Sequence, residues 1–336
     1  MADRRERPPG RVIGLAGVLV LAVLAGCSGG GEDPVTVGLI TKQEDNPFWV
    51  TMREVAEDVA GDRDAELVSA TGASDVDVEA QVEALREMVA SGVDGILIAP
   101  NDSEAVVPAI EEAREEGIVV IAVDTPTDPE DAVDALFATD NRRAGELIGQ
   151  YAKAKADEEG IDARIALLDL APGIRSGELR REGFLAGFGL EVGDPEIVGT
   201  VDTEGDRAKG EEGLGQLLEE HPDINVVYTV NEPAALGAVE ALREAGRSMD
   251  EVVVVSVDGG CEAIKDAVRP GDIDATAQQY PENMAREGVR AIAAAARGGE
   301  APTGFLDTGV TLITGDPVDG VESRGVPYGV RNCWGD

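Results

Sequence analysis

The sequence predicts an α/β protein made of two doubly wound lobes with parallel sheets, joined by a hinge that the chain crosses three times. The first observation behind this prediction is a series of short apolar runs, each ending at a polar residue and followed by a helical pattern. Such runs are typical of buried parallel strands. They are Val35–Thr41, Gly95–Ala99, Val119–Val123, Leu136–Thr139, Val226–Val230, Val252–Val257 and Ala275–Ala277.

The segments between these runs carry the helical repeat. In Val76–Ser91, the apolar residues Val78, Val82, Leu85 and Val89 recur every three or four positions, which gives the helix one buried face. After Asp140 the alternation of strand and helix starts again, which indicates a second lobe. The remaining predicted elements are helices Phe48–Ala60, Glu104–Glu116, Arg142–Glu159, Gly177–Gly189, Arg207–His221 and Ala234–Ala245, and strands Arg164–Leu170 and Ile197–Val201.

The length of the chain and its last third predict how the lobes are connected. About 300 residues follow the N-terminal leader, which is too many for one compact core and enough for two. Helix Glu282–Arg297 and strand Gly309–Ile313 come too late to form a domain alone, so we expect them to return to the two lobes. The chain then crosses near Asp140, Gln279 and Asp307. The predicted lobes are 35–139 with 280–307, and 140–279 with 308–336.

The N-terminus is predicted to be an export signal (residues 1–26) followed by a flexible tether (27–34). A basic leader precedes the apolar stretch Val12–Ala25, which is short for a membrane span. Leu24-Ala25-Gly26-Cys27 resembles a bacterial lipoprotein lipobox, in which Cys27 becomes the lipidated first residue of the mature chain. The alternatives are an ordinary signal with an incidental cysteine, or an uncleaved anchor.

Composition excludes some partners. Sixty-seven acidic and 28 basic residues give a formal charge of −39, so we expect no nucleic-acid partner. Too few histidines are present for a zinc site, and no cofactor motif follows a strand, so we expect neither metal nor cofactor. Cys261 and Cys333 are the remaining cysteines, and in an exported domain they predict a disulfide, with two free thiols as the alternative.

Six motifs in the same order resemble those of periplasmic sugar-binding proteins of the ribose-binding type, the substrate-capturing components of ABC importers. They are Asn46-Pro47-Phe48-Trp49, Ala138-Thr139-Asp140-Asn141, Arg180-Arg181-Glu182-Gly183-Phe184, Asn231-Glu232-Pro233-Ala234-Ala235-Leu236-Gly237-Ala238, Val257-Asp258-Gly259 and Ala275-Thr276-Ala277-Gln278-Gln279. The resemblance covers essentially all of Val35–Ile313.

This resemblance implies a shell of residues around a sugar. The residues are Asn46, Phe48, Trp49 and Asp124 from the first lobe, Arg180, Asn231 and Asp258 from the second, and Gln279 at the hinge. The chemistry fits, because aromatic planes pack on the C–H faces of a sugar ring. Carboxylates accept hydrogen bonds from hydroxyls, arginine donates, and amides do both.

Each of these residues also has a purely structural interpretation. Asparagine and aspartate at strand ends often cap the next helix, which applies to Asn46, Asn231 and Asp258, while Asp124 can stabilise a turn. The two aromatic residues can belong to the core. Arg180 can pair with a neighbouring glutamate, with Arg181 as its rival for the ligand, and Gln278 rivals Gln279.

Two departures from the family pattern predict a pocket different from that for ribose. Thr125 stands where the family often has an arginine, and Gly205 lies near the place of a second-lobe aromatic. Lys42 is expected to supply the missing cation. The ending Asn332-Cys333-Trp334-Gly335 looks like that of fructose-binding members.

The resemblance therefore implies an extracytoplasmic, lipid-anchored substrate-binding protein of a sugar importer. It is expected to be a monomer that captures a fructose-like or ribose-like monosaccharide and delivers it to a membrane permease. A sensor that presents its ligand to a membrane receptor is the alternative. An enzyme is not expected, because the only histidine, His221, lies at a helix end before Pro222, away from any strand end.

Overall fold

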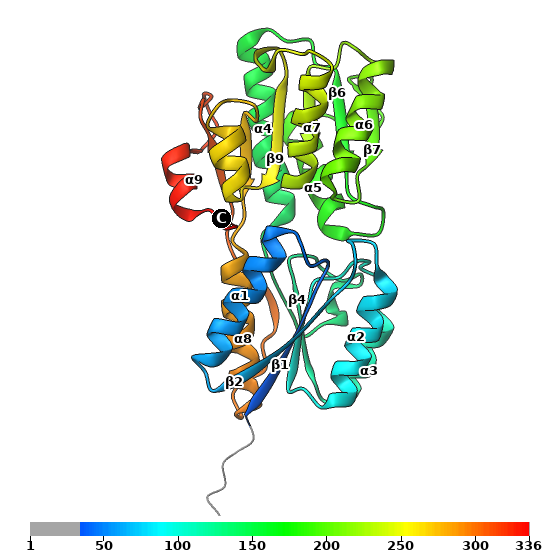
Figure 1. The fold of residues 1–336 in the computed structure, drawn as a ribbon, viewed down its shortest axis with the longest axis vertical. Helices are drawn as coiled ribbons and strands as arrows, with labels where there is room; N and C mark the ends of the chain where they lie inside the picture. Colours follow the sequence, from blue (N-terminus) through cyan, green and yellow to red (C-terminus); the bar gives the residue numbers. More distant parts are fainter. Residues whose placement is uncertain (1–33, 336) are drawn as a thin grey trace, which may run out of the picture. The chain divides into compact units, whose positions relative to one another are not determined.

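The computed structural model describes residues 34–335, which contain two sheets with helices on both faces of each (Figure 1). The prediction of a two-lobed α/β fold is confirmed. We call the sheet that contains β1 the first lobe and the sheet that contains β6 the second lobe, each with its flanking helices. Cys27 and the predicted signal and tether up to Asp33 lie outside the described residues.

The first lobe has a six-stranded, fully parallel sheet in the order β11-β5-β4-β3-β1-β2. Helices α1 and α8 cover one face, and α2 and α3 cover the other (Figure 1). Its elements are β1 (Val35–Thr41), α1 (Pro47–Gly61), β2 (Ala65–Thr71), α2 (Val78–Ser91), β3 (Gly95–Ile98), α3 (Val107–Glu115), β4 (Val119–Val123), β5 (Ala135–Ala138), α8 (Pro281–Ala296) and β11 (Gly304–Asp307).

The second lobe has a seven-stranded sheet in the order β13-β12-β10-β9-β8-β6-β7. Helices α4 and α5 pack on one face and α6 and α7 on the other. Its elements are α4 (Asn141–Glu159), β6 (Ile165–Asp169), α5 (Arg175–Phe188), β7 (Ile197–Asp202), α6 (Arg207–Glu220), β8 (Val226–Thr229), α7 (Glu232–Glu244), β9 (Val253–Asp258), β10 (Ala275–Gln278), β12 (Thr311–Thr314), β13 (Arg324–Gly325) and α9 (Val326–Asn332). A one-turn π-helix, Ala263–Val268, follows β9.

Strands β12 and β13 depart from the parallel direction of the second sheet, because β12 runs antiparallel to β10 and β13 runs parallel to β12. The reason lies in the connections. Strand β10 ends at Gln278 beside the hinge, and β11 of the first lobe also ends at the hinge, at Asp307. Only residues 308–310 separate β11 from β12, so β12 enters the second sheet from the hinge and runs away from it.

The C-terminal residues contact both lobes. Helix α9 packs on the second lobe, against β12 and the π-helix. Trp334 instead belongs to the buried cluster of the first lobe that contains Phe48, and only 5% of its surface is exposed. The chain end therefore touches both lobes, beside the three crossings between β5 and α4, β10 and α8, and β11 and β12.

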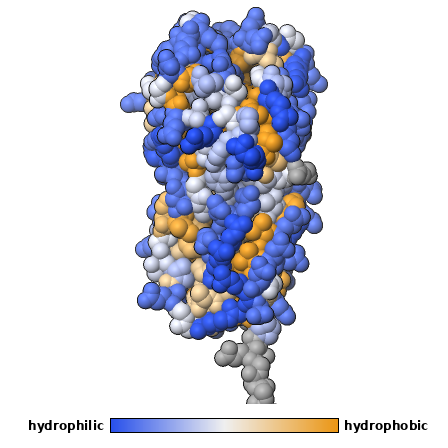
Figure 2. Space-filling model, turned by 90° about the vertical axis from the view of Figure 1, so that its left-hand side faces the viewer, coloured by the Kyte–Doolittle hydropathy of each residue, from blue (hydrophilic) through white to orange (hydrophobic). Residues whose placement is uncertain are grey.

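The surface is consistent with the acidic composition. On the face shown in Figure 2, hydrophilic residues predominate, and apolar residues form separate strips rather than one broad patch. Within residues 34–335, no helix combines the length and apolar character needed to cross a bilayer.

Candidate functional site

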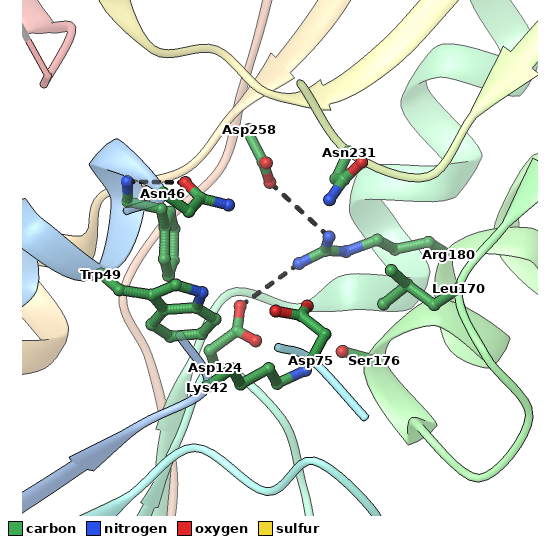
Figure 3. A pocket seen from close by; sticks show the side chains of 11 residues that line it. Lys42, Asn46, Trp49, Asp75, Asp124, Leu170, Ser176, Arg180, Asn231 and Asp258 are labelled. Atoms are coloured by element: carbon green, nitrogen blue, oxygen red, sulfur yellow. Dashed lines mark hydrogen bonds and ion pairs between the residues drawn. The ribbon is translucent and has the colours of Figure 1, made fainter. Parts of the chain in front are cut away.

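A cavity lies between the two lobes, at the carboxyl ends of their strands (Figure 3). Parallel α/β sheets place ligand sites at this edge. The residues that line the cavity are Lys42, Asn46, Phe48, Trp49, Asp75 and Asp124 from the first lobe, and Leu170, Ser176, Arg180, Asn231 and Asp258 from the second. Of the nine residues predicted to bind ligand, the structure therefore brings together all except Gln279.

The two predicted carboxylates sit at strand ends in an uncommon backbone conformation. Asp124 follows β4 with φ +61°, and Asp258 ends β9 with φ +98°. Residues other than glycine rarely adopt positive φ, and such strain concentrates at functional sites. Both side chains are almost fully buried, and Figure 3 shows them on opposite sides of Arg180.

Arg180 connects the two lobes. Its guanidinium donates to Asp124 Oδ1 of the first lobe at 3.3 Å and lies 3.6 Å from Asp258 Oδ1 of the second lobe. It also donates to Asn141 Oδ1 at 2.7 Å and to the carbonyl oxygen of Val230 at 3.1 Å. The rival Arg181 points elsewhere, because it pairs with Asp169 at 3.0 Å.

Close packing of α4 against α5 fixes the position of Arg180. A Cβ at Gly145 would come within 2.0 Å of the Arg180 carbonyl oxygen, and a Cβ at Gly183 within 2.1 Å of the Arg142 carbonyl oxygen. Glycine at these positions lets the two backbones approach each other. Asn141, at the start of α4, then holds the guanidinium and donates to the backbone oxygen of Asp124 at 2.8 Å.

Gln279 supports the site from behind. Its amide donates to Asp258 Oδ1 at 2.7 Å, and its side chain is fully buried. Gln279 was predicted to contact the ligand, but in this structure it holds Asp258 and does not line the cavity. Its rival Gln278 points away from the cavity, donating to the carbonyl oxygens of Gly259 and Gly329.

The two asparagines combine both predicted roles. Asn46 Oδ1 accepts from the Phe48 N–H at 2.9 Å and caps α1, while its amide nitrogen points into the cavity (Figure 3). Asn231 Oδ1 caps α7 by accepting from Ala234 N–H, and its amide donates to the Gly205 carbonyl oxygen at 3.1 Å. Capping fixes each amide while leaving it on the wall of the cavity.

An aromatic cluster forms the first-lobe wall. Phe48 and Trp49 contact each other edge to face, with ring centroids 4.7 Å apart. Trp49 Nε1 is buried without a hydrogen-bond partner in the described chain, and Figure 3 shows it directed into the cavity. A buried N–H of this kind calls for an acceptor that a ligand can supply.

Lys42 is buried, with 1% of its surface exposed, and its ammonium lies 5.8 Å from the centre of the Trp49 ring. Burial lowers the pKa of Lys42, and the nearby carboxylates of Asp75 and Asp124 oppose this change. The structure thus places a cation on the first-lobe wall of the cavity, where Thr125 supplies no guanidinium.

Asp75, Leu170 and Ser176 line the cavity but were missed by the sequence reasoning. Asp75 lies in the loop before α2, accepts from Gln43 Nε2 at 2.8 Å, and has its pKa raised by burial. Ser176 lies in the first turn of α5, where its hydroxyl shares a hydrogen bond with that of Thr125 at 2.8 Å. Asp75 and Ser176 do not end an apolar run, and Leu170, which ends the predicted strand Arg164–Leu170, is itself apolar and so gave no sign of a ligand contact.

The lobes are closed on each other in this structure. The Ser103 N–H of the first lobe donates to the Gly173 carbonyl oxygen of the second at 2.9 Å, and Arg175 N–H donates to the Ser103 hydroxyl at 3.2 Å. At the other rim, a Cβ at Gly205 would approach Asp75 to 3.3 Å. The cavity is therefore bounded by both lobes.

The chemistry of this wall suits a neutral, hydroxyl-rich molecule. Three carboxylates accept, two cations and an indole N–H donate, and amides do both. Burial raises the pKa of Asp258, against the effect of Arg180, and raises the pKa of its neighbour Glu232 to about 8. Across residues 34–335, no group of three or more metal-ligating side chains is placed to hold a metal ion.

Fold and site together define a two-lobed solute-binding protein. A periplasmic binding protein domain matches residues 37–300. The D-ribose/D-allose-binding protein of Pseudomonas aeruginosa is 32% identical over 83% of this chain and 88% of its own, and the ribose import binding protein of Bacillus subtilis is 30% identical over 75% and 79%. A solute-binding protein of an ABC transporter from Agrobacterium vitis, solved with D-fucose, superposes with a TM-score of 0.77, at 27% identity over 89% of this chain and 99% of its own.

The chain belongs to the periplasmic binding protein family, among the sugar-binding proteins of the ribose-binding type. It is a binding protein and not an enzyme.

Proposed function

We propose that this protein is the extracytoplasmic substrate-binding component of a sugar ABC importer, which encloses one monosaccharide between its lobes and delivers it to a membrane permease. The observation that carries the proposal is the interlobe cavity, whose aromatic wall and charged or amide groups come from both lobes. A sugar bound there bridges the lobes, so its binding free energy favours the closed form.

The donors and acceptors are sufficient for tight binding. Hydrogen bonds to charged groups contribute about 1.5–3 kcal/mol each, so a handful of them support micromolar or tighter affinity. Asp75, Asp124 and Asp258 each offer carboxylate oxygens, Lys42 offers an ammonium, and Trp49 offers an indole N–H without a partner in the described structure.

The sugar is proposed to be fructose or a ribose-like monosaccharide. Relatives and structural neighbours bind ribose, allose and D-fucose according to their names, which supports a monosaccharide of five or six carbons. Asp75 and Lys42 occupy the first-lobe wall where Thr125 provides no guanidinium, so the preferred hydroxyl pattern is expected to differ from that of ribose.

A thermal-shift screen tests this function. D-ribose, D-allose, D-fructose, D-fucose and polyols are added to the purified domain, and the melting temperature is recorded. A sugar at about 100 times its dissociation constant stabilises the folded form by roughly 2.7 kcal/mol, which raises the melting temperature measurably. No shift with any pentose or hexose would contradict the proposal.

We further propose that Cys27 carries the lipid that anchors the protein outside the cytoplasmic membrane and that the protein acts as a monomer. The lipobox-like sequence supports the anchor. Mass spectrometry of protein extracted from membranes is expected to show a chain that begins at lipidated Cys27. An unmodified, uncleaved N-terminus would contradict it.

A further inference from the structure

The C-terminal tail, Cys333 to Gly335, is attached to the second lobe by two bonds. Cys333 forms a disulfide with Cys261, three residues beyond Asp258, and their Cα atoms lie 4.9 Å apart. The Cys261 N–H also donates to the Trp334 carbonyl oxygen at 2.8 Å. The position of Trp334 is therefore tied to the residues that follow Asp258, whose carboxylate lines the cavity.

The side chain of Trp334 points the other way, into the first lobe and the hinge. Its ring contacts Phe48 edge to face, with centroids 5.2 Å apart, and its Nε1 donates to the Gln279 carbonyl oxygen at 3.0 Å. The next residue, Gly335, packs so closely on Pro47 that a Cβ there would come within 2.6 Å of its side chain. The indole thus fills the space behind the aromatic wall of the cavity.

Each group that Trp334 contacts acts on the cavity. Phe48 lines it directly, between Trp334 and Trp49. Gln279 holds Asp258 through a bond of 2.7 Å. The same indole covers Gly260, because a Cβ on that glycine would lie 3.0 Å from the ring. The tail therefore contacts Phe48, which lines the cavity from the first lobe, and Gln279, which holds Asp258 of the second lobe.

We propose that Trp334 is a positioning residue for ligand binding and that the Cys261–Cys333 disulfide holds it in place, so the affinity for sugar depends on the redox state of this disulfide. The proposal rests on the function proposed above. Chain ends fray unless they are tied down, and this end is tied by one covalent bond across 72 residues of sequence. After reduction, only two hydrogen bonds of Trp334, with Cys261 N–H and with the Gln279 carbonyl oxygen, and the packing of Trp334 and Gly335 oppose the conformational entropy of the tail.

Three variants separate the contributions of the Trp334 ring, its hydrogen bond to Gln279 and the Cys261–Cys333 disulfide. Trp334→Ala removes the ring, Trp334→Phe keeps a ring but loses the bond to Gln279, and Cys261→Ser with Cys333→Ser removes the disulfide. Val318→Ala is the matched control, since Val318 is a buried side chain in the core of the second lobe. Dissociation constants for D-ribose and D-fructose are measured by calorimetry.

We expect Trp334→Ala and the double serine variant to weaken binding about tenfold, Trp334→Phe to recover most of that loss, and reduced wild type to match the serine variant. Val318→Ala should lower the melting temperature with unchanged affinity. Equal affinities in oxidised and reduced wild type, or equal losses in Trp334→Phe and Trp334→Ala, would overturn the proposal.

Amide hydrogen exchange without sugar tests the positioning role separately from the proposed function. Reduction should speed exchange in peptides that cover residues 46–50 and 279–281 as well as 258–264. Faster exchange in 258–264 alone would show that the disulfide only stabilises its own lobe, and it would overturn the inference. If wild type binds neither sugar but the wider pattern of exchange appears, the proposed function fails while the positioning role of Trp334 stands.

Discussion

Replacing Arg180 with methionine tests the central electrostatic feature of the cavity. The guanidinium makes two contacts with carboxylates of opposite lobes and donates to Asn141 and Val230, and only 3% of its residue surface is exposed. Methionine has a similar length but no charge, so Asp124 and Asp258 would lose their cationic neighbour. Breaking a buried ion pair in this way typically costs about 3–5 kcal/mol.

We expect the lower end of that range for the free energy of unfolding, about 3 kcal/mol, because Lys42 remains beside the same carboxylates. Urea denaturation of Arg180→Met and wild type measures the difference, and Arg180→Lys serves as a control that keeps the charge but not the planar donors. Sugar binding should be lost in Arg180→Met. A variant within about 0.5 kcal/mol of wild type, with unchanged affinity, would refute the assigned role of Arg180.

The remaining predictions concern the walls of the cavity. Asn231→Ala and Asp258→Ala should abolish sugar binding with the fold intact, as measured by calorimetry and circular dichroism; normal binding would show that the site is wrong. Gly205→Phe should keep the lobes apart, because a side chain there meets Asp75 of the first lobe, so scattering with saturating sugar should show no decrease in radius of gyration. Glu232 keeps its proton to a pKa of about 8 in the folded protein but loses it near its ordinary pKa when unfolded. Stability should therefore fall as pH rises from about 5 to 8, by at most ~1.4 kcal/mol per pH unit, and Glu232→Gln should flatten that slope in denaturation curves. An unchanged slope would mean that Glu232 is ionised throughout.

The helices and strands that could be predicted from the sequence are those whose apolar pattern lies within their own residues. Strand β9 was predictable from its continuous run of apolar residues, and helix α2 from apolar residues that recur every three or four positions. Strand β2 lies at a sheet edge and is half polar, so its sequence does not stand out. The antiparallel direction of β12 was not predictable, because direction depends on where the chain enters the sheet, which no periodicity records.

The site divides in the same way. Asp124 directly follows β4, Asp258 ends β9, and Asn46 lies in the short loop between β1 and α1, so their positions at one edge were predictable. Asp75 comes from a loop, and its place in the cavity depends on how that loop folds over Lys42. The contact of Trp334 with a residue at the other end of the chain lies beyond any local pattern.

The left-handed backbone at Asp124 and Asp258 lowers the stability of the folded protein at two positions whose carboxylates line the cavity. Each such conformation costs on the order of 1–3 kcal/mol, and the folded protein bears this cost whether or not a sugar is present. Glycine would relieve the strain and remove the carboxylate in one step. Glycine at either position would therefore favour the folded state at the expense of a carboxylate that lines the cavity.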